Sequence, residues 1–252
     1  VSLGLHPAEA RRFGPEIRSA AGLAEDRVFE ADRLRDPSFL DVLRGFAPDL
    51  ILTVTWGRIL SPEVLSIPRR GGYNLHNGYL PYNRGWHANV WSILDRTPSG
   101  VTLHRLSEKA DAGDVIARLA VPVAPVDTGG TLYAKLLRAM VELFRLTWPT
   151  LRDGMPSGEP QPRGAGTYHA RKDLVSRDRI DLDGTYTGRE LIDLLRARTF
   201  PPHPGAYFEE NGRRVYVRIQ LAYAEETEWG GGRVCWHPPS DPLAGLREAG
   251  GP

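Results

Sequence analysis

The chain has 252 residues, which allows one large domain or a medium domain with a small appendage. Its 32 basic and 31 acidic residues nearly cancel, so the charge balance gives no electrostatic footprint for a long nucleic-acid partner. No apolar run approaches the ~20 residues needed to span a bilayer, and the single cysteine, Cys235, excludes an intrachain disulfide and favours a reducing, cytoplasmic setting.

The N-terminal part of the chain alternates between short extended runs and helical patterns. Residues 1–5 can form a strand, and residues 8–24 suit a helix or an irregular loop. An Asp-Pro-Ser start and apolar side chains at helical spacing predict a helix over residues 36–46. Residues 49–55 are almost continuously apolar, as expected of a strand buried on both faces of a parallel sheet. This order of a helix and a buried strand favours an α/β fold.

A candidate binding loop follows that strand. Trp56, Gly57, Arg58 and Ile59 stand at its carboxyl end, which is where open α/β sheets bind their ligands. The alternative is that the side chains of Trp56 and Ile59 only close the core.

Two polar side chains of the next predicted strand, residues 73–76, point to the same face. Side chains two positions apart share a face of a strand, so Asn74 and His76 stand side by side. Asn77 and Gly78 are typical of a turn, which leaves the pair at the end of the strand and open to a ligand. Taken singly, each residue also suits an ordinary structural role in a strand end or turn.

A second strand, residues 101–106, leads into a glycine-containing loop with Asp111 and Asp114. The polar residues suit acyl transfer to an amine: an amide such as Asn74 can stabilise an oxyanion, and His76 can accept a proton. A carboxylate such as Asp111 can orient the imidazole and stabilise its cation, while Asp114 is expected to brace the loop. Direct transfer of the acyl group requires no nucleophilic serine or cysteine.

The rest of the chain divides into helical, linker-like and extended stretches. An amphipathic pattern after Thr128 gives the clearest helix prediction in the chain, ending by residues 149–154. Pro and Gly mark residues 155–166 as a linker, and a capping-box pattern opens a helix over residues 187–198. Residues 215–221 alternate like a strand, and we expect the Gly- and Pro-rich residues 225–252 to form a tail or an extended arm. No residue spacing is typical of a zinc site, so no metal is expected.

The motifs occur in a recognisable order. Asn74 and His76 are followed by L-P-x-x-R-G at residues 80–85 and by D-x-G at residues 111–113. Together they resemble the catalytic signature of the 10-formyltetrahydrofolate-dependent formyltransferases, over about residues 39–216.

The resemblance implies that Asn74, His76 and Asp111 are the catalytic trio, and that 10-formyltetrahydrofolate is the cosubstrate. It implies an α/β fold, a formyltransferase-type, Rossmann-like domain with a mixed, mainly parallel sheet, plus a small β-rich C-terminal subdomain. The expected division is a catalytic domain over residues 1–154, a linker over 155–166, a C-terminal subdomain over 167–224 and a tail over 225–252. Family members usually begin with a Met-led strand and a glycine turn, and this chain lacks both, which puts one edge of the sheet in question.

The resemblance also implies where the two substrates bind. In the family, the loop that corresponds to residues 56–59 lines the pterin pocket, largely with backbone groups. The expected folate-binding set is Trp56, Gly57, Arg58, Ile59, Ala110, Asp111 and Asp114.

The variant N-G-Y-L-P after the Asn-His pair is similar to the sugar N-formyltransferases, which act on nucleotide-linked amino sugars. Arg84 could meet a phosphate with its planar fork, and Tyr79, Tyr82 or Trp86 could pack on a sugar or base. In the alternative, Arg84 only bridges backbone carbonyls. The expected acceptor-binding set is Asn77, Gly78, Tyr79, Tyr82 and Arg84.

Other acceptors remain open from the sequence. They include methionyl-tRNA, which the near-neutral charge disfavours, glycinamide ribonucleotide and a hydroxyornithine-like amino acid. Water in place of the amine would give a hydrolase, and a folate-binding scaffold without activity is the non-enzymatic alternative. The expected partners are small molecules and, because related sugar enzymes often pair through their C-terminal β segments, a second copy in a homodimer; no membrane is expected.

Overall fold

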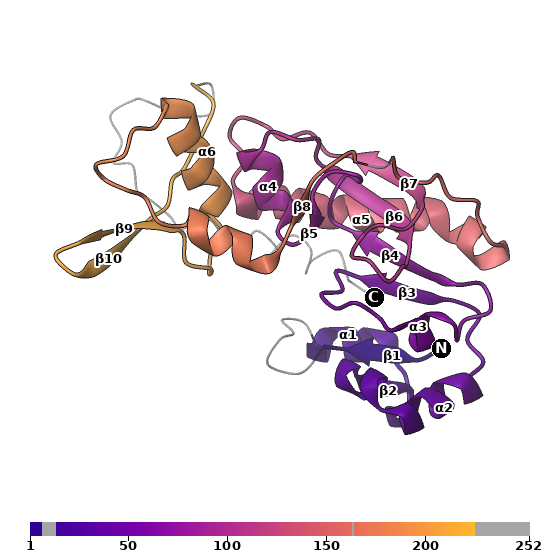
Figure 1. Cartoon of the computed structure of the whole chain (residues 1–252). Coiled ribbons are helices and arrows are strands. Elements are labelled where there is room, and N and C mark those ends of the chain that lie inside the picture. The colour runs from indigo at the N-terminus through magenta and orange to yellow at the C-terminus, as the bar shows by residue number, and fades with distance from the viewer. Residues whose placement is uncertain (7–13, 163, 225–252) are drawn as a thin grey trace.

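The computed structural model describes residues 1–6, 14–162 and 164–224 (Figure 1). At its centre lies a four-stranded sheet with the order β3–β4–β6–β7. Its strands are β3 (Ile51–Val54), β4 (Gly72–His76), β6 (Gly100–Arg105) and β7 (Val115–Ala120). The sheet is mixed and flanked by helices, which confirms the predicted α/β class.

The pairing within this sheet is less parallel than the sequence predicts. β3 pairs with β4 in parallel, whereas β4–β6 and β6–β7 are antiparallel. A short loop joins β6 to β7 and reverses the chain, and this connection imposes the antiparallel arrangement. In the described part of the sheet β3 is an edge strand with Val54 50% exposed, so the prediction of a strand buried on both faces is wrong.

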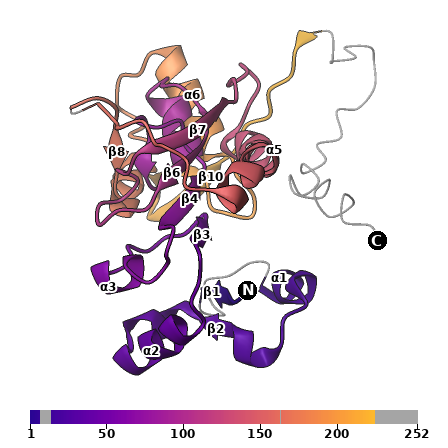
Figure 2. The same ribbon diagram turned by 90° about the vertical axis from the view of Figure 1, so that its right-hand side faces the viewer.

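The main core lies between this sheet and helix α5 (Gly129–Asp153), which packs against β6 and β7 (Figure 2). Thr128 begins the helix by a reciprocal capping box, in which its hydroxyl accepts from Thr131 N at 3.2 Å. Leu132 and Leu136 are fully buried in the core, and each such side chain contributes about 1.5–3 kcal/mol of transfer free energy. The short helix α4 (Ala88–Leu94) follows the loop of residues 77–87 and packs its apolar side chains into the same core.

The N-terminal residues form a smaller unit beyond β3, seen below the sheet in Figure 2. Its own hydrophobic cluster includes Phe39, Leu43 and Val64. Asp36 accepts from Ser38 N at 2.9 Å and so begins the predicted helix, here α2. The elements are β1 (Leu3–Leu5), α1 (Gly14–Ala21), β2 (Val28–Glu30), α2 (Pro37–Gly45), α3 (Pro62–Leu65) and the 3-10 helices η2 (Glu25–Arg27) and η3 (Ala31–Arg35). β1 and β2 form a separate parallel pair.

The C-terminal residues return to the sheet before they diverge from it. β8 (Tyr168–His169) pairs in parallel with β5 (Arg84–Gly85), and Glu159 of the predicted linker bridges to Val115 on β7. The 3-10 helix η4 (Arg171–Arg177), α6 (Gly188–Arg198) and the hairpin β9 (Ala206–Glu210) with β10 (Arg213–Val217) follow. Figure 1 shows that this hairpin projects away from the N-terminal unit.

The predicted capping box of Thr187 and Glu190 opens α6 as expected. The predicted strand over residues 215–221 overlaps β10, which starts and ends earlier. The predicted tail over residues 225–252, with Cys235, lies outside the described residues. None of the described helices is both long and apolar enough to cross a membrane.

Candidate active site

Three polar side chains from the middle of the sheet surround one carboxylate. Asn74 and His76 lie on β4, His104 lies opposite Asn74 on β6, and Asp111 lies in the loop that leads to β7. Asp111 Oδ1 is 3.2 Å from Asn74 Nδ2 and 3.3 Å from His104 Nε2, while Asp111 Oδ2 is 3.6 Å from His76 Nδ1. The three residues predicted as a catalytic trio therefore meet at Asp111.

The backbone around Asp111 is fixed from three sides. Asp111 has a left-handed φ of 49°, and a Cβ on Gly113 would lie only 2.0 Å from the carbonyl oxygen of Arg105, so the third position of D-x-G must be glycine. Gly85 N donates to Asp111 Oδ2 at 2.8 Å. Gln161, from the predicted linker, donates from Nε2 to the carbonyl oxygens of both Asp111 and Gly113 at 2.8 Å.

Asn74 is held in a single orientation. The hydroxyl of Thr53 on β3 donates to Asn74 Oδ1 at 2.7 Å, which directs Asn74 Nδ2 toward Asp111 and His104. His104 Nδ1 donates to the carbonyl oxygen of Arg105 at 2.8 Å, so the Nε2 atom of the neutral ring accepts from Asn74 at 3.1 Å. The amide is thus preorganised as a donor, which is what stabilisation of an oxyanion requires.

His76 is held by its other ring nitrogen. His76 Nε2 donates to the carbonyl oxygen of Asn83 at 2.9 Å, which leaves Nδ1 as the nitrogen that faces Asp111. A Cβ on Gly78 would lie 2.5 Å from His76 Nε2, so this turn glycine gives the imidazole its room. Asn83 is fully buried and donates from its amide to Ser92 Oγ at 3.0 Å and to Thr97 Oγ1 at 2.8 Å.

Burial and charge set the protonation states of these groups. Burial lowers the pKa of His76 below its ordinary value, although the neighbouring Asp111 carboxylate opposes this effect. Burial by itself would raise the pKa of Asp111, but the neighbouring imidazoles of His76 and His104 and the hydrogen bond from Gly85 N outweigh it and lower that pKa to about 2. At neutral pH the cluster therefore contains a neutral imidazole that can accept a proton and a carboxylate that can stabilise the resulting cation.

The predicted folate loop reaches this cluster through Trp86. A Cβ on Gly57 would lie 2.9 Å from the Trp86 ring, and Trp86 directly follows the Gly85 that binds Asp111. In the same loop Trp56 stacks on His6 at 4.5 Å between ring centroids, Arg58 pairs with Asp32, and Ile59 is 64% exposed. Ala110 and Asp114, the remaining residues of the predicted set, are half-buried in the Asp111 loop.

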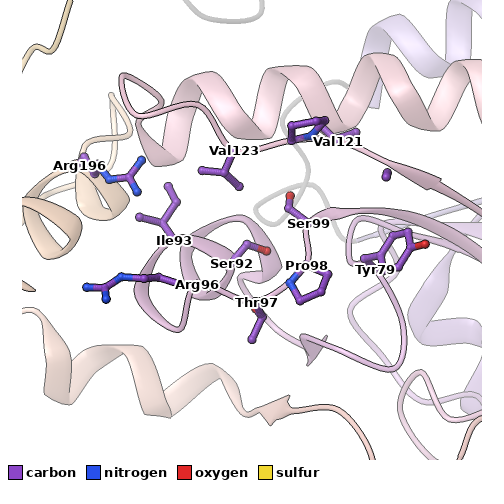
Figure 3. A pocket seen from close by; sticks show the side chains of 12 residues that line it. Tyr79, Ser92, Ile93, Arg96, Thr97, Pro98, Ser99, Val121, Val123 and Arg196 are labelled. Atoms are coloured by element: carbon purple, nitrogen blue, oxygen red, sulfur yellow. The ribbon is translucent and has the colours of Figure 1, made fainter. Parts of the chain in front are cut away.

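The predicted acceptor residues are divided between different surroundings. Gly78 lies against His76, whereas Tyr79 lines a cavity of about 500 Å³ together with Ser92 and Thr97 (Figure 3). The cavity lining does not include the Asn74–His76–Asp111 trio. Arg84 begins β5, and its Nε is buried without a hydrogen-bond partner among the described residues. Asn77 and Tyr82 are half-buried in the same loop.

Three polar residues of the network were not singled out from the sequence as site residues. They are His104, Thr53 and Asn83, which contact the trio through pairing across strands or through a carbonyl group. His104 gave the clearest signal, because it is a histidine within the predicted strand 101–106, which leads directly to the Asp111 loop. The other two depend on contacts that no local pattern encodes.

Comparisons with known proteins identify the family of the chain. Residues 7–146 match the family described as Formyl transferase, and residues 173–223 match the N-formyltransferase dimerization C-terminal domain. A 4-N formyltransferase from Francisella tularensis has a similar structure, with a TM-score of 0.76 and 29% identity over 88% of this chain and 87% of that one.

Two further structures are informative. The formyltransferase PseJ from Anoxybacillus kamchatkensis is 32% identical over 69% of this chain and 87% of its own, with a TM-score of 0.56; it was determined in complex with UDP-4,6-dideoxy-4-formamido-L-AltNAc and tetrahydrofolate. A sugar N-formyltransferase from a Shewanella species shares the fold, with a TM-score of 0.74 and 22% identity over 86% of this chain and 83% of that one. The chain belongs to the formyl transferase family and is a formyl-transferring enzyme.

Proposed function

We propose that this enzyme transfers the formyl group of 10-formyltetrahydrofolate to the primary amine of a nucleotide-linked amino sugar. The observation that carries the proposal is the cluster in which the Asp111 carboxylate lies 3.2 Å from Asn74 Nδ2 and 3.6 Å from His76 Nδ1. The PseJ complex supports the two substrates, because that relative holds a nucleotide-linked formamido sugar together with tetrahydrofolate.

The loop at residues 56–59 suits the folate. The indole Nε1 of Trp56 is buried without a hydrogen-bond partner among the described residues, and Ile59 offers an exposed apolar side chain. A flat heteroaromatic ring with acceptor atoms can use both kinds of group. The bound folate would supply an activated formyl group. The residues proposed to hold it are Trp56, Gly57, Arg58, Ile59, Ala110, Asp111 and Asp114.

The residues of the cluster then divide the chemistry among them. The amine nitrogen attacks the formyl carbon, and a new C–N bond forms as an electron pair moves to the formyl oxygen. Asn74 Nδ2 exchanges its hydrogen bond to His104 Nε2 for one to the developing oxyanion, while its other N–H stays on Asp111. His76 takes the amine proton at Nδ1, where Asp111 Oδ2 stabilises the cation, and returns a proton to the departing nitrogen when the old C–N bond breaks.

A mass-based assay tests the proposal. The enzyme is incubated with 10-formyltetrahydrofolate and a panel of nucleotide-linked amino sugars, and with the corresponding sugars that carry a hydroxyl in place of the amine as controls. We expect one amino sugar to gain a formyl mass, while every hydroxyl control stays unchanged. Formyl loss from the folate without any formylated product would contradict transfer and indicate hydrolysis.

We also propose that two copies of the chain pair through the β9–β10 hairpin. The match of residues 173–223 to a dimerization domain supports this arrangement, and so do Val215 and Tyr216, which leave 41% and 49% of their surface exposed on β10. Light scattering after size-exclusion chromatography should give a dimer for the wild type and a monomer for Tyr216→Arg. Val42→Arg, at an exposed apolar position on α2, is the matched control and should stay dimeric.

A further inference from the structure

Trp86 lies where the Asp111 loop, the candidate folate loop and the helix η4 meet. It directly follows Gly85, whose N–H binds the Asp111 carboxylate at 2.8 Å, and its ring approaches Gly57 of the candidate folate loop. The guanidinium of Arg171, at the start of η4, lies 5.3 Å from the centre of the Trp86 ring. Trp86 is nevertheless 38% exposed, so the place where these parts meet is open to a ligand.

Basic side chains surround His87, the residue that follows Trp86. The ring of His87 lies 6.0 Å from that of Trp86. Burial, and then the charges of Arg198, Arg171 and His203, lower the pKa of His87 to about 4. These groups come from different elements, α6 and η4 among them, and they converge on one side chain.

The two arginines differ in what neutralises them. Arg198 forms a two-pronged pair with Asp178, with one hydrogen bond of 2.8 Å. Arg171 is exposed and makes no ion pair with a carboxylate in the described part of the chain. An arginine that is held by an aromatic ring and lacks a carboxylate partner is well suited to bind phosphate oxygens through its fork of N–H groups.

We propose that Arg171, positioned by Trp86 and with His87 beside it, binds the diphosphate of the nucleotide-linked acceptor. A diphosphate bound here would lie next to the backbone that holds Asp111, and the amino sugar attached to it could extend toward the trio. Arg84, whose side chain is partly buried in β5, then supports the strand rather than being the principal phosphate ligand. This inference rests on the proposed acceptor class, and it names the residues that recognise its charged half.

Binding of UDP and dTDP, measured by isothermal titration calorimetry, tests the inference without requiring turnover. Loss of a charge-assisted hydrogen bond is expected to weaken binding to Arg171→Gln by about tenfold or more. Arg145→Gln removes an exposed arginine of α5 and is the matched control, which should bind like the wild type. Equal affinities for wild type and Arg171→Gln, or no binding of either nucleotide to the wild type, would overturn the inference.

The pKa of His87 provides a second readout. If Arg171 had only a structural role, nucleotide binding would not change this pKa. An NMR titration should show that the pKa of His87 rises when UDP or dTDP saturates the wild type, because the bound anion offsets the nearby cations. The variant Arg171→Gln should raise that pKa in the free enzyme and reduce the further rise on nucleotide addition. His87→Asn assigns the resonance, since asparagine tolerates the left-handed φ of 61° at this position. An unchanged titration at saturating nucleotide would contradict the assignment.

The outcome also separates this inference from the proposed function. If nucleotide binding depends on Arg171 but no amino sugar is formylated, the site stands and the proposed reaction fails. If an amino sugar is formylated but neither nucleotide binding nor the acceptor KM changes in Arg171→Gln, the reaction stands and the site is wrong. If both hold, Arg171→Gln should raise the acceptor KM while the KM for 10-formyltetrahydrofolate stays unchanged.

Discussion

The side chains around Asp111 are buried and joined by direct hydrogen bonds. Trp86, which directly follows Gly85, and Arg171, at the start of η4, are instead exposed and meet through a contact between the guanidinium and the ring. The first region draws its side chains from neighbouring strands of one sheet. The second brings together a loop and the start of the C-terminal subdomain. The proposed chemistry therefore lies in a buried, hydrogen-bonded network, which we call the rigid region, and the proposed acceptor site lies on exposed side chains, which we call the adaptable region.

The largest effects should follow from breaking the rigid region itself. His76→Ala removes the proposed proton acceptor, and Asp111→Asn removes the charge that stabilises its cation. Each should lower kcat by about 100-fold or more while circular dichroism and the melting temperature report a folded protein. Glu108→Gln, at an exposed position of the same loop, is the control and should keep most of the activity. Near-normal turnover of His76→Ala would show that the proton goes elsewhere.

A smaller effect is expected when the network is loosened rather than broken. Thr53→Val keeps the shape of a 7% exposed side chain but removes the hydroxyl that holds Asn74 Oδ1. The amide can then rotate away from the oxyanion, so kcat should fall by about tenfold with the two KM values little changed. Thr53→Ser restores the hydroxyl and should recover most of the loss. A change confined to the KM values would mean that Thr53 acts on binding and not on the orientation of Asn74.

The pH dependence of stability compares the two regions directly, because each contains a histidine whose pKa is lowered, the buried His76 in one and the half-buried His87 in the other. Below the ordinary histidine pKa of 6.5, the unfolded chain binds protons that the folded chain does not bind, so stability is lost as the pH falls below about 6.5. Each histidine can contribute at most about 1.4 kcal/mol per pH unit. We would measure the free energy of unfolding by urea denaturation between about pH 7 and pH 5. It should fall less steeply with decreasing pH for His87→Asn than for the wild type. An identical slope would contradict the lowered pKa of His87.

The sequence was sufficient for the parts of the fold that depend on local patterns. The alternation of β4 brought Asn74 and His76 to one face, and hydroxyl caps marked the starts of α5 and α6. The burial of β3 was misjudged because an apolar run does not show which strands and helices will cover it. Local composition predicts the type of an element far better than its neighbours.

The parts of the site that were missed depend on register or on distant pairing. His104 stands beside Asn74 only because β6 pairs antiparallel with β4 in one particular register. Arg171 reaches Trp86 only because β8 pairs with β5. Neither register nor pairing between segments so far apart can be derived from a single sequence, since many alignments of short strands have similar local patterns.

The smallest predicted effect concerns Tyr79, which belongs to the adaptable side although its loop also carries the carbonyl of Asn83 that holds His76. Its ring is half-buried, with the Arg118 guanidinium 5.7 Å from the ring centre, and Tyr79→Phe keeps this contact and removes only the hydroxyl. A neutral hydrogen bond contributes about 0.5–1.5 kcal/mol, so loss of one to the acceptor should raise the acceptor KM by a few-fold and leave kcat unchanged. If kcat fell as in Thr53→Val, the boundary between the rigid and adaptable regions would have to be moved to include this loop.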